Sequence, residues 1–201
     1  MKKISFALLF CLCTLASLAQ SGKPLDLKEI ISGEFTPQSI SGVIPIPGEH
    51  YSQMNADKTQ IIKYSFKTGK PVEVLFDAAT ARECPFKKFD SYSFAPDGSK
   101  LLIATETTPI YRHSYTAVHY IYSLKRNFDG KINNVVEKLS DGGPQQVPVF
   151  SPDGYQVAFV RDNNIFLVKL LYGNSESQVT EDGKRNEILN GIPDWVYEEE
   201  F

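Results

Sequence analysis

Two stretches of the chain repeat one pattern: YSFAPDGSKLLIA at residues 92–104 and PVFSPDGYQVAFV at residues 148–160. In each stretch a Pro-Asp-Gly turn separates two runs rich in apolar residues. Proline presets the backbone angle of one turn position and glycine accepts the left-handed angle of another, so the pattern is typical of two strands joined by a tight turn. A weaker copy, MNADKTQIIKY, occupies residues 54–64. The repeats therefore predict a series of antiparallel hairpins.

The spacing of the repeats predicts the fold class. The turn aspartates Asp57, Asp97 and Asp153 lie 40 and 56 residues apart. Further strands are expected at residues 72–76, 117–124 and 165–170. Repeats of about 40 to 50 residues with four strands each indicate a β-propeller, and the longer second interval indicates an insertion. About three units fit, whereas a ring closes with at least four. We expect an all-β fold, a partial β-propeller that is the N-terminal part of a longer protein.

The first residues have the composition of a secretion signal. Lys2 and Lys3 precede an apolar run at residues 4–15, and small residues then lead to a cleavage site between Ala19 and Gln20. The run is too short to span a bilayer, which takes about 20 apolar residues. We therefore expect the protein to be exported, to the periplasm, the cell surface or the medium.

Three segments are expected. They are a signal peptide at residues 1–19, an N-terminal helix (over 25–35) with an irregular approach segment at 20–50, and the propeller part at 51–201. The helix is predicted by the apolar spacing of Leu27, Ile30 and Ile31 and by Gly33, which would stop it.

Charge, cysteines and motifs exclude several functions. Without Lys2 and Lys3 the 21 basic residues fall to 19 against 24 acidic ones, a formal net charge of −5. No basic run is present, so no nucleic-acid partner is expected. Cys84 is the one cysteine after residue 19, which predicts no intrachain disulfide and no cysteine metal site. Because GxGxxG, P-loop, HExxH and GxSxG motifs are missing from the sequence, no cofactor, no metal and no nucleophile are assigned to these residues.

The sequence NGIPDWVYEEEF at residues 190–201 is both acidic and aromatic. Asp194 stands where a helix N-cap would, after the helix-breaking Gly-Ile-Pro. Consecutive helical positions point about 100° apart, so three carboxylates cannot all face one partner. Two of them can converge on a small cation, with Trp195, Tyr197 and Phe201 shielding the pair from water. The other interpretation of three adjacent glutamates is a solvated helix face.

The insertion in the second repeat contains IYRHSYTAVHYIY at residues 110–122. Arg112 among tyrosines fits either a surface strand with an extended side chain or a planar donor aimed at a carbonyl or carboxylate. His113 and His119 have no acidic or cysteine partner at ligand spacing, so we interpret them as structural. His50 is an isolated loop histidine and carries no functional signal.

Several of these segments resemble the dipeptidyl peptidase IV group of the prolyl-oligopeptidase-type serine peptidases. DWVYEEE at residues 194–200 is similar to the double-glutamate motif of that group, and RHSYTA at 112–117 is similar to its arginine segment. The Phe-x-Pro-Asp-Gly turns, NIFLVK at 164–169 and NGI at 190–192 follow in the same order as in those propellers. The resemblance covers roughly residues 25–201.

The resemblance implies roles for three residues. Glu199 and Glu200 would bind the free N-terminal ammonium of a peptide substrate, and Arg112 would hold a backbone carbonyl at its second residue. The family's catalytic serine, aspartate and histidine belong to an α/β-hydrolase domain that follows the propeller, so residues 20–201 alone are expected to hydrolyse nothing. The whole protein would then be an exported serine exopeptidase that releases X-Pro or X-Ala dipeptides, and dimerisation is common in the family.

Two other functions remain open at this point. A related prolyl tripeptidyl peptidase would set its amine anchor differently, and the consecutive Glu199 and Glu200 favour the dipeptide enzyme. A non-catalytic periplasmic propeller, acting as a binding or scaffold module for peptide N-termini, belongs to another class. This module is distinguished from the enzymes by whether a hydrolase domain with a Gly-x-Ser-x-Gly motif follows Phe201 in the reading frame.

Overall fold

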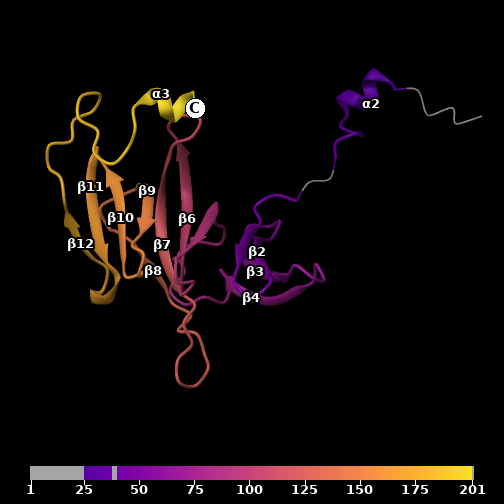
Figure 1. The fold of residues 1–201 in the computed structure, drawn as a ribbon, viewed down its shortest axis with the longest axis horizontal. Coiled ribbons are helices and arrows are strands. Elements are labelled where there is room, and N and C mark those ends of the chain that lie inside the picture. The colour runs from indigo at the N-terminus through magenta and orange to yellow at the C-terminus, as the bar shows by residue number, and fades with distance from the viewer. Residues whose placement is uncertain (1–24, 38–39, 201) are drawn as a thin grey trace, which may run out of the picture. The chain divides into compact units, whose positions relative to one another are not determined.

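The computed structural model describes residues 25–37 and 40–200 (Figure 1). The predicted signal peptide and its cleavage site lie outside the described residues. The chain divides into two compact units, residues 1–41 and residues 42–201, which are described separately. No helix among the described residues is long and apolar enough to cross a membrane.

The described part of the first unit contains one short helix, α2 (Leu27–Ile31). Asp26 caps its start by accepting a hydrogen bond from the Lys28 N–H at 3.3 Å, and Gly33 adopts a φ of +79° just beyond its end. The helix is therefore much shorter than the expected 25–35. The reason is local, because a glycine in the left-handed conformation stops the helix soon after the cap has started it.

The second unit contains three antiparallel sheets of four strands, each in sequential order, which confirms the partial propeller of about three blades. The first sheet consists of β1 (Ile44–Ile46), β2 (His50–Met54), β3 (Gln60–Ser65) and β4 (Pro71–Asp77). The second consists of β5 (Ser91–Phe94), β6 (Lys100–Pro109), β7 (Tyr115–Ser123) and β8 (Val136–Lys138). The third consists of β9 (Gln146–Phe150), β10 (Gln156–Arg161), β11 (Asn164–Lys169) and β12 (Ser175–Gln178). A 3-10 turn, η1 (Leu170–Tyr172), and a last helix, α3 (Trp195–Glu199), complete the elements.

The first strand lies where an irregular approach segment was expected. β1 pairs with β2 between Ile44 and Ser52, although Pro45 stands in its centre. Proline is tolerated there because β1 is an edge strand and its missing N–H interrupts no second ladder. The sheet thus starts before the expected boundary at residue 51.

The middle sheet has core on both faces. Leu101 and Ile103 of β6 pack in one apolar cluster with Ile61 and Phe76 of the first sheet. Leu102, between them, packs in a second cluster with residues of the third sheet: Val157, Phe159, Phe166 and Val168. Successive strand residues point to opposite faces, so β6 contributes to both clusters in turn. This face-to-face stacking is the arrangement of propeller blades.

The turns of the repeats form as predicted. Gly98 and Gly154 both adopt a φ of +69°. Asp97 and Asp153 each accept a hydrogen bond at 3.0 Å from the backbone N–H two residues further on. In the weaker copy Lys58 takes the glycine's place with a φ of +59°.

The insertion in the second repeat lengthens a hairpin. β6 and β7 are ten and nine residues long and extend together toward residues 110–114. The ladder shifts register between Thr105 and Thr108, where Glu106 adopts a φ of +54° and the Thr107 N–H donates to Asp90 at 3.0 Å. A bulge of this kind bends and twists the strand, which directs the tip of the hairpin.

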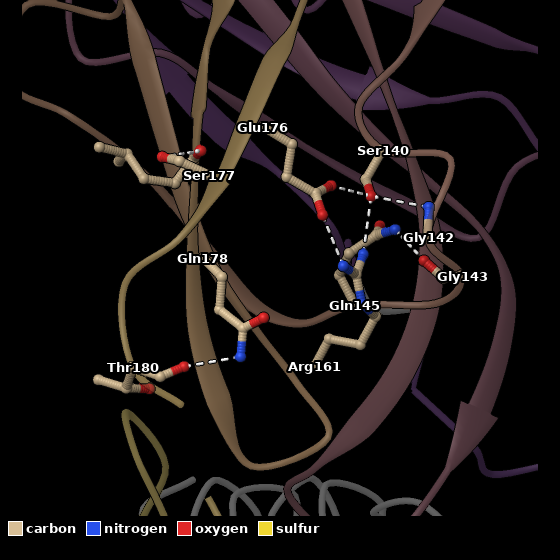
Figure 2. A network of polar contacts seen from close by, with 10 residues as sticks. Ser140, Gly142, Gly143, Gln145, Arg161, Glu176, Ser177, Gln178 and Thr180 are labelled. Carbon is tan, nitrogen blue, oxygen red and sulfur yellow. Dashed lines mark hydrogen bonds and ion pairs between the residues drawn. The ribbon is translucent and has the colours of Figure 1, made fainter. Parts of the chain in front are cut away.

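A polar network ties the connection between the second and third sheets to β10 and β12 (Figure 2). Arg161 donates to Ser140 at 2.9 Å and to Glu176 at 2.5 Å, and Ser140 also bonds Glu176. The Arg161 guanidinium lies over the Phe166 ring, 4.1 Å from its centre. Burial by itself raises the pKa of Glu176, but the bonds from Arg161 and Ser140 outweigh it and hold that pKa below its ordinary value.

Candidate functional site

The C-terminal helix α3 starts where the sequence predicts it. Asp194 accepts hydrogen bonds from the N–H groups of Val196 and Tyr197, at 3.0 and 3.4 Å. These are two of the donors that the first turn of a helix leaves without an intrahelical partner. The cap therefore places the glutamates of the last turn at defined angles around a very short helix.

The segment before α3 is attached to the third sheet. The N–H of Asn190 donates to the carbonyl oxygen of Asn163, in the β10–β11 turn, at 3.1 Å. Gly191 follows with a φ of +77°, and a Cβ added to it would lie 2.8 Å from Val160 and 3.0 Å from Ile165. Only glycine accepts this backbone angle and this close contact without strain. This attachment brings the chain back from the third sheet toward the hairpin of the second.

The tip of the β6–β7 hairpin contacts α3, as the ribbon view shows (Figure 1). The backbone N–H of Arg112 donates to Glu199 Oε2 at 2.8 Å, and the N–H of His113 donates to the carbonyl oxygen of Glu198 at 2.9 Å. Ser114 Oγ donates to Glu198 Oε2 at 3.1 Å. Three consecutive hairpin residues thus bond two consecutive helix residues.

The three glutamates have different environments. Glu198 is 7% exposed and faces Ser114. The Glu199 side chain is 35% exposed and lies 3.7 Å from the Arg112 guanidinium, which is itself 59% exposed. Glu200 is exposed, and its N–H caps the end of the helix by donating to Val196 at 2.9 Å. The carboxylates therefore divide among different surroundings, as the angular step of a helix requires.

The expected aromatic shield is not seen around the described glutamates. Trp195 is 57% exposed and Tyr197 is 63% exposed. Phe201, the third member, lies outside the described residues. Trp195 and Tyr197 therefore keep most of their surface in contact with solvent.

A cavity of about 580 Å³ lies between the hairpin tip and the segment that leads into α3. Its lining includes Ile110, Tyr111, Asn163, Arg185, Trp195 and Glu198. The hairpin tip and α3 therefore border a hollow that has both apolar and charged walls.

The structure brings Arg112 and Glu199 together, and Glu200 directly follows Glu199 in the chain. The sequence did not single out Ser114, although it lies inside the arginine segment. A serine carries no pattern that distinguishes a buried donor from a surface hydroxyl. Its contact with Glu198 spans 84 residues, so no local signal could have identified it.

The remaining candidates have structural surroundings. His119 is buried, and its Nδ1 and its backbone N–H lie 2.9 and 3.1 Å from Gln145 Oε1. Burial lowers the pKa of this imidazole, against the raising effect of its hydrogen bonds. Burial raises the pKa of the Cys84 thiol, which donates to the carbonyl oxygen of Phe86. Among residues 25–37 and 40–200, no three His, Cys, Asp or Glu residues are grouped so that they could hold a metal ion.

Comparison with known proteins identifies a family and several relatives. The family described as dipeptidyl peptidase IV (DPP IV) N-terminal region matches residues 95–201. Human prolyl endopeptidase FAP is 33% identical over 181 residues, which cover 89% of this chain and 22% of the relative. A probable dipeptidyl-aminopeptidase B of Colletotrichum graminicola is 31% identical over 196 residues, 90% of this chain and 21% of the relative.

A solved structure is similar to the chain as well. The crystal structure of Porphyromonas gingivalis dipeptidyl peptidase 4 has 47% sequence identity and a TM-score of 0.76, and the match covers 90% of this chain and 25% of that one. The chain thus spans about a quarter or less of the length of these relatives.

Proposed function

The chain belongs to the dipeptidyl peptidase IV N-terminal region family, and from this membership we propose that it anchors the substrate in an exported dipeptidyl peptidase. In this proposal Glu199 and Glu200 bind the free N-terminal ammonium of a peptide. Arg112 binds a backbone carbonyl at the second residue. The serine nucleophile belongs to an α/β-hydrolase domain of the whole protein, outside residues 1–201, and the signal-like residues 1–19 direct export.

The observation that supports the proposal is the contact between Arg112 and Glu199. The backbone N–H of Arg112 holds one Glu199 oxygen at 2.8 Å, and the Arg112 guanidinium lies 3.7 Å from the other. Both side chains keep exposed surface, so each can still accept a ligand group. The carboxylate can bind the N-terminal ammonium of a peptide, and the adjacent guanidinium can bind a backbone carbonyl close to that ammonium.

The chemistry of this pair favours a free amine. An ammonium between carboxylates forms charge-assisted hydrogen bonds, which are about twice as strong as neutral ones. An acetylated amine has lost its charge and two of its donors, so it loses these bonds. Fixing the N-terminus also determines how many residues reach the nucleophile, and this positioning supplies most of the effect of such an anchor. Release of X-Pro or X-Ala dipeptides follows from the family resemblance.

The test uses the natural gene product and a pair of substrates. A Gly-Pro chromogenic amide is assayed beside the same amide with an acetylated amine. We expect cleavage of the free-amine form alone, and we expect Glu199→Ala and Glu200→Ala each to abolish it. Residues 20–201 by themselves are expected to cleave neither substrate.

Two outcomes would contradict the proposal. Equal cleavage of the free-amine and acetylated substrates would show that Glu199 and Glu200 do not anchor the substrate through its amine. Cleavage of neither form by an intact product would favour the binding or scaffold module, and isothermal titration with Gly-Pro-initiated peptides would then measure the binding.

A further inference from the structure

The buried Glu198 differs in function from its two neighbours. We propose that Glu198 and Ser114 are positioning residues that fasten α3 to the hairpin tip and thereby set the place of Glu199 beside Arg112. This inference rests on the proposed function, because it assigns a role within the same amine anchor.

Glu198 is placed to hold the helix and not to hold a ligand. One carboxylate oxygen accepts from Ser114 Oγ at 3.1 Å, and the Glu198 carbonyl oxygen accepts from the His113 N–H at 2.9 Å. Glu198 and Ser114 are 7% and 8% exposed. A buried carboxylate whose oxygen already has a donor is poorly placed to receive a solvated ammonium, and losing that donor is costly.

The helix needs an outside attachment. α3 contains five residues, and isolated helices shorter than about 12–15 residues are marginal in water. Glu198 is the buried residue of this helix, and its apolar residues all remain at least partly exposed. The chain before it is held at Asn190 and Gly191, toward the third sheet. The hydrogen bonds of Glu198 and Glu199 therefore attach the helix to the β6–β7 hairpin of the second sheet.

The order of the contacts shows how Glu198 can position the helix while Glu199 binds the amine. Residues 112, 113 and 114 of the hairpin bond residues 199, 198 and 198 of the helix, in antiparallel order. If the Ser114–Glu198 bond is lost, the helix can turn about its axis, and Glu199 then moves relative to Arg112. Displacement of a positioning group by about 1 Å can lower the rate about 100-fold.

The test compares four variants of the natural gene product on the Gly-Pro amide. Glu198→Ala and Ser114→Ala remove the bond, and we expect kcat/KM to fall about 10-fold to 100-fold, mainly through KM. Glu198→Gln keeps an acceptor oxygen for Ser114, and we expect it to stay within about 3-fold of the wild type. Glu181→Ala, which removes an exposed carboxylate outside α3, serves as the matched control and should change nothing.

A second measurement separates positioning from general loss of structure. A small serine-directed fluorophosphonate has no amine, so its reaction rate does not depend on the anchor. We expect this rate to be unchanged in Ser114→Ala and Glu198→Ala. A parallel fall in fluorophosphonate labelling, or equal losses in Glu198→Gln and Glu198→Ala, would overturn the positioning role.

The outcomes also distinguish this inference from the proposed function. If Glu199→Ala abolishes cleavage while Ser114→Ala and Glu198→Ala do not change KM, only the inference fails. If Glu199→Ala and Glu200→Ala are themselves as active as the wild type, the proposed anchor fails and the inference with it. Where Glu198→Ala does not fold, Ser114→Ala, which loses one hydroxyl, decides.

Discussion

The backbone N–H of Arg112 donates a 2.8 Å hydrogen bond to the carboxylate of Glu199, 87 residues further along the chain. The bond uses the main chain, so it does not depend on the arginine side chain. The guanidinium lies at 3.7 Å, a distance at which an exposed ion pair contributes about 0–1 kcal/mol. The place of Glu199 and the function of the Arg112 side chain can therefore be separated by mutation.

We expect Arg112→Ala to lower kcat/KM for the Gly-Pro amide while the preference for a free amine is kept. The carbonyl contact is lost, at about 1.5–3 kcal/mol for a hydrogen bond to a charged group, which is a factor of about 10 to 150. Arg112→Lys should recover little, because an ammonium does not reproduce the planar donor pair. The measurement is kcat/KM on the free and acetylated substrates. Loss of discrimination between them in Arg112→Ala would show that the side chain also holds Glu199.

Gly191→Ala should destabilise the protein more than Gly98→Ala. Both glycines have a positive φ, +77° and +69°, so both variants incur the left-handed penalty of about 1–2 kcal/mol. A Cβ at Gly191 also meets Val160 at 2.8 Å, whereas nothing lies within 4 Å of one at Gly98. Overpacking adds about 1–3 kcal/mol. Urea denaturation midpoints measure the difference, and equal midpoints would mean that the segment before α3 is not seated on β10 and β11.

Asp194→Ala should impair the amine anchor, and Asp194→Asn should not. The carboxylate accepts from two N–H groups at the start of α3. Removing an N-cap costs about 0.5–2 kcal/mol, while asparagine caps about as well as aspartate. We expect a several-fold rise in KM for the alanine variant, with little change in thermal midpoint. Equal kinetics for the two variants would indicate that the hairpin contacts hold α3 without its cap.

Glu176→Gln should lower stability at neutral pH, and the loss should vanish in acid. The folded-state pKa of Glu176 is held below its ordinary value by Arg161 and Ser140 against the effect of burial. The carboxylate therefore contributes stability above its unfolded pKa of about 4.3, and that contribution is lost as the pH falls through the lower folded value.

We expect a difference of about 1.5–3 kcal/mol between wild type and Glu176→Gln at pH 7, from the bonds to the charged group. The measurement is the free energy of unfolding in urea from pH 7 down to pH 3. Glu181→Gln, at an exposed carboxylate, is the control and should follow the wild type at every pH. A difference that persisted unchanged at pH 3 would mean that the carboxylate charge is not what stabilises the network.

Much of the fold could be predicted from the sequence because its determinants are local. The Pro-Asp-Gly turns at 96–98 and 152–154 and the cap at Asp194 each depend on a few neighbouring residues. The spacing of the turns then indicated the number of blades. Local signals failed where an edge strand tolerated Pro45, and they gave the first helix, Leu27–Ile31, bounds that are too wide.

The sequence by itself determined the three sheets, the position of the last helix and the presence of Arg112, Glu199 and Glu200. Only the tertiary structure decided which glutamate is buried on Ser114, which one faces Arg112, and that Trp195 and Tyr197 remain exposed. Turns and caps are chosen by backbone angles within a few residues. The contacts of Ser114 with Glu198 and of Arg112 with Glu199 span 84 and 87 residues. They depend on how the bulged β6–β7 hairpin of the second sheet packs against the segment held on the third sheet, and neighbouring residues in the sequence do not determine that packing.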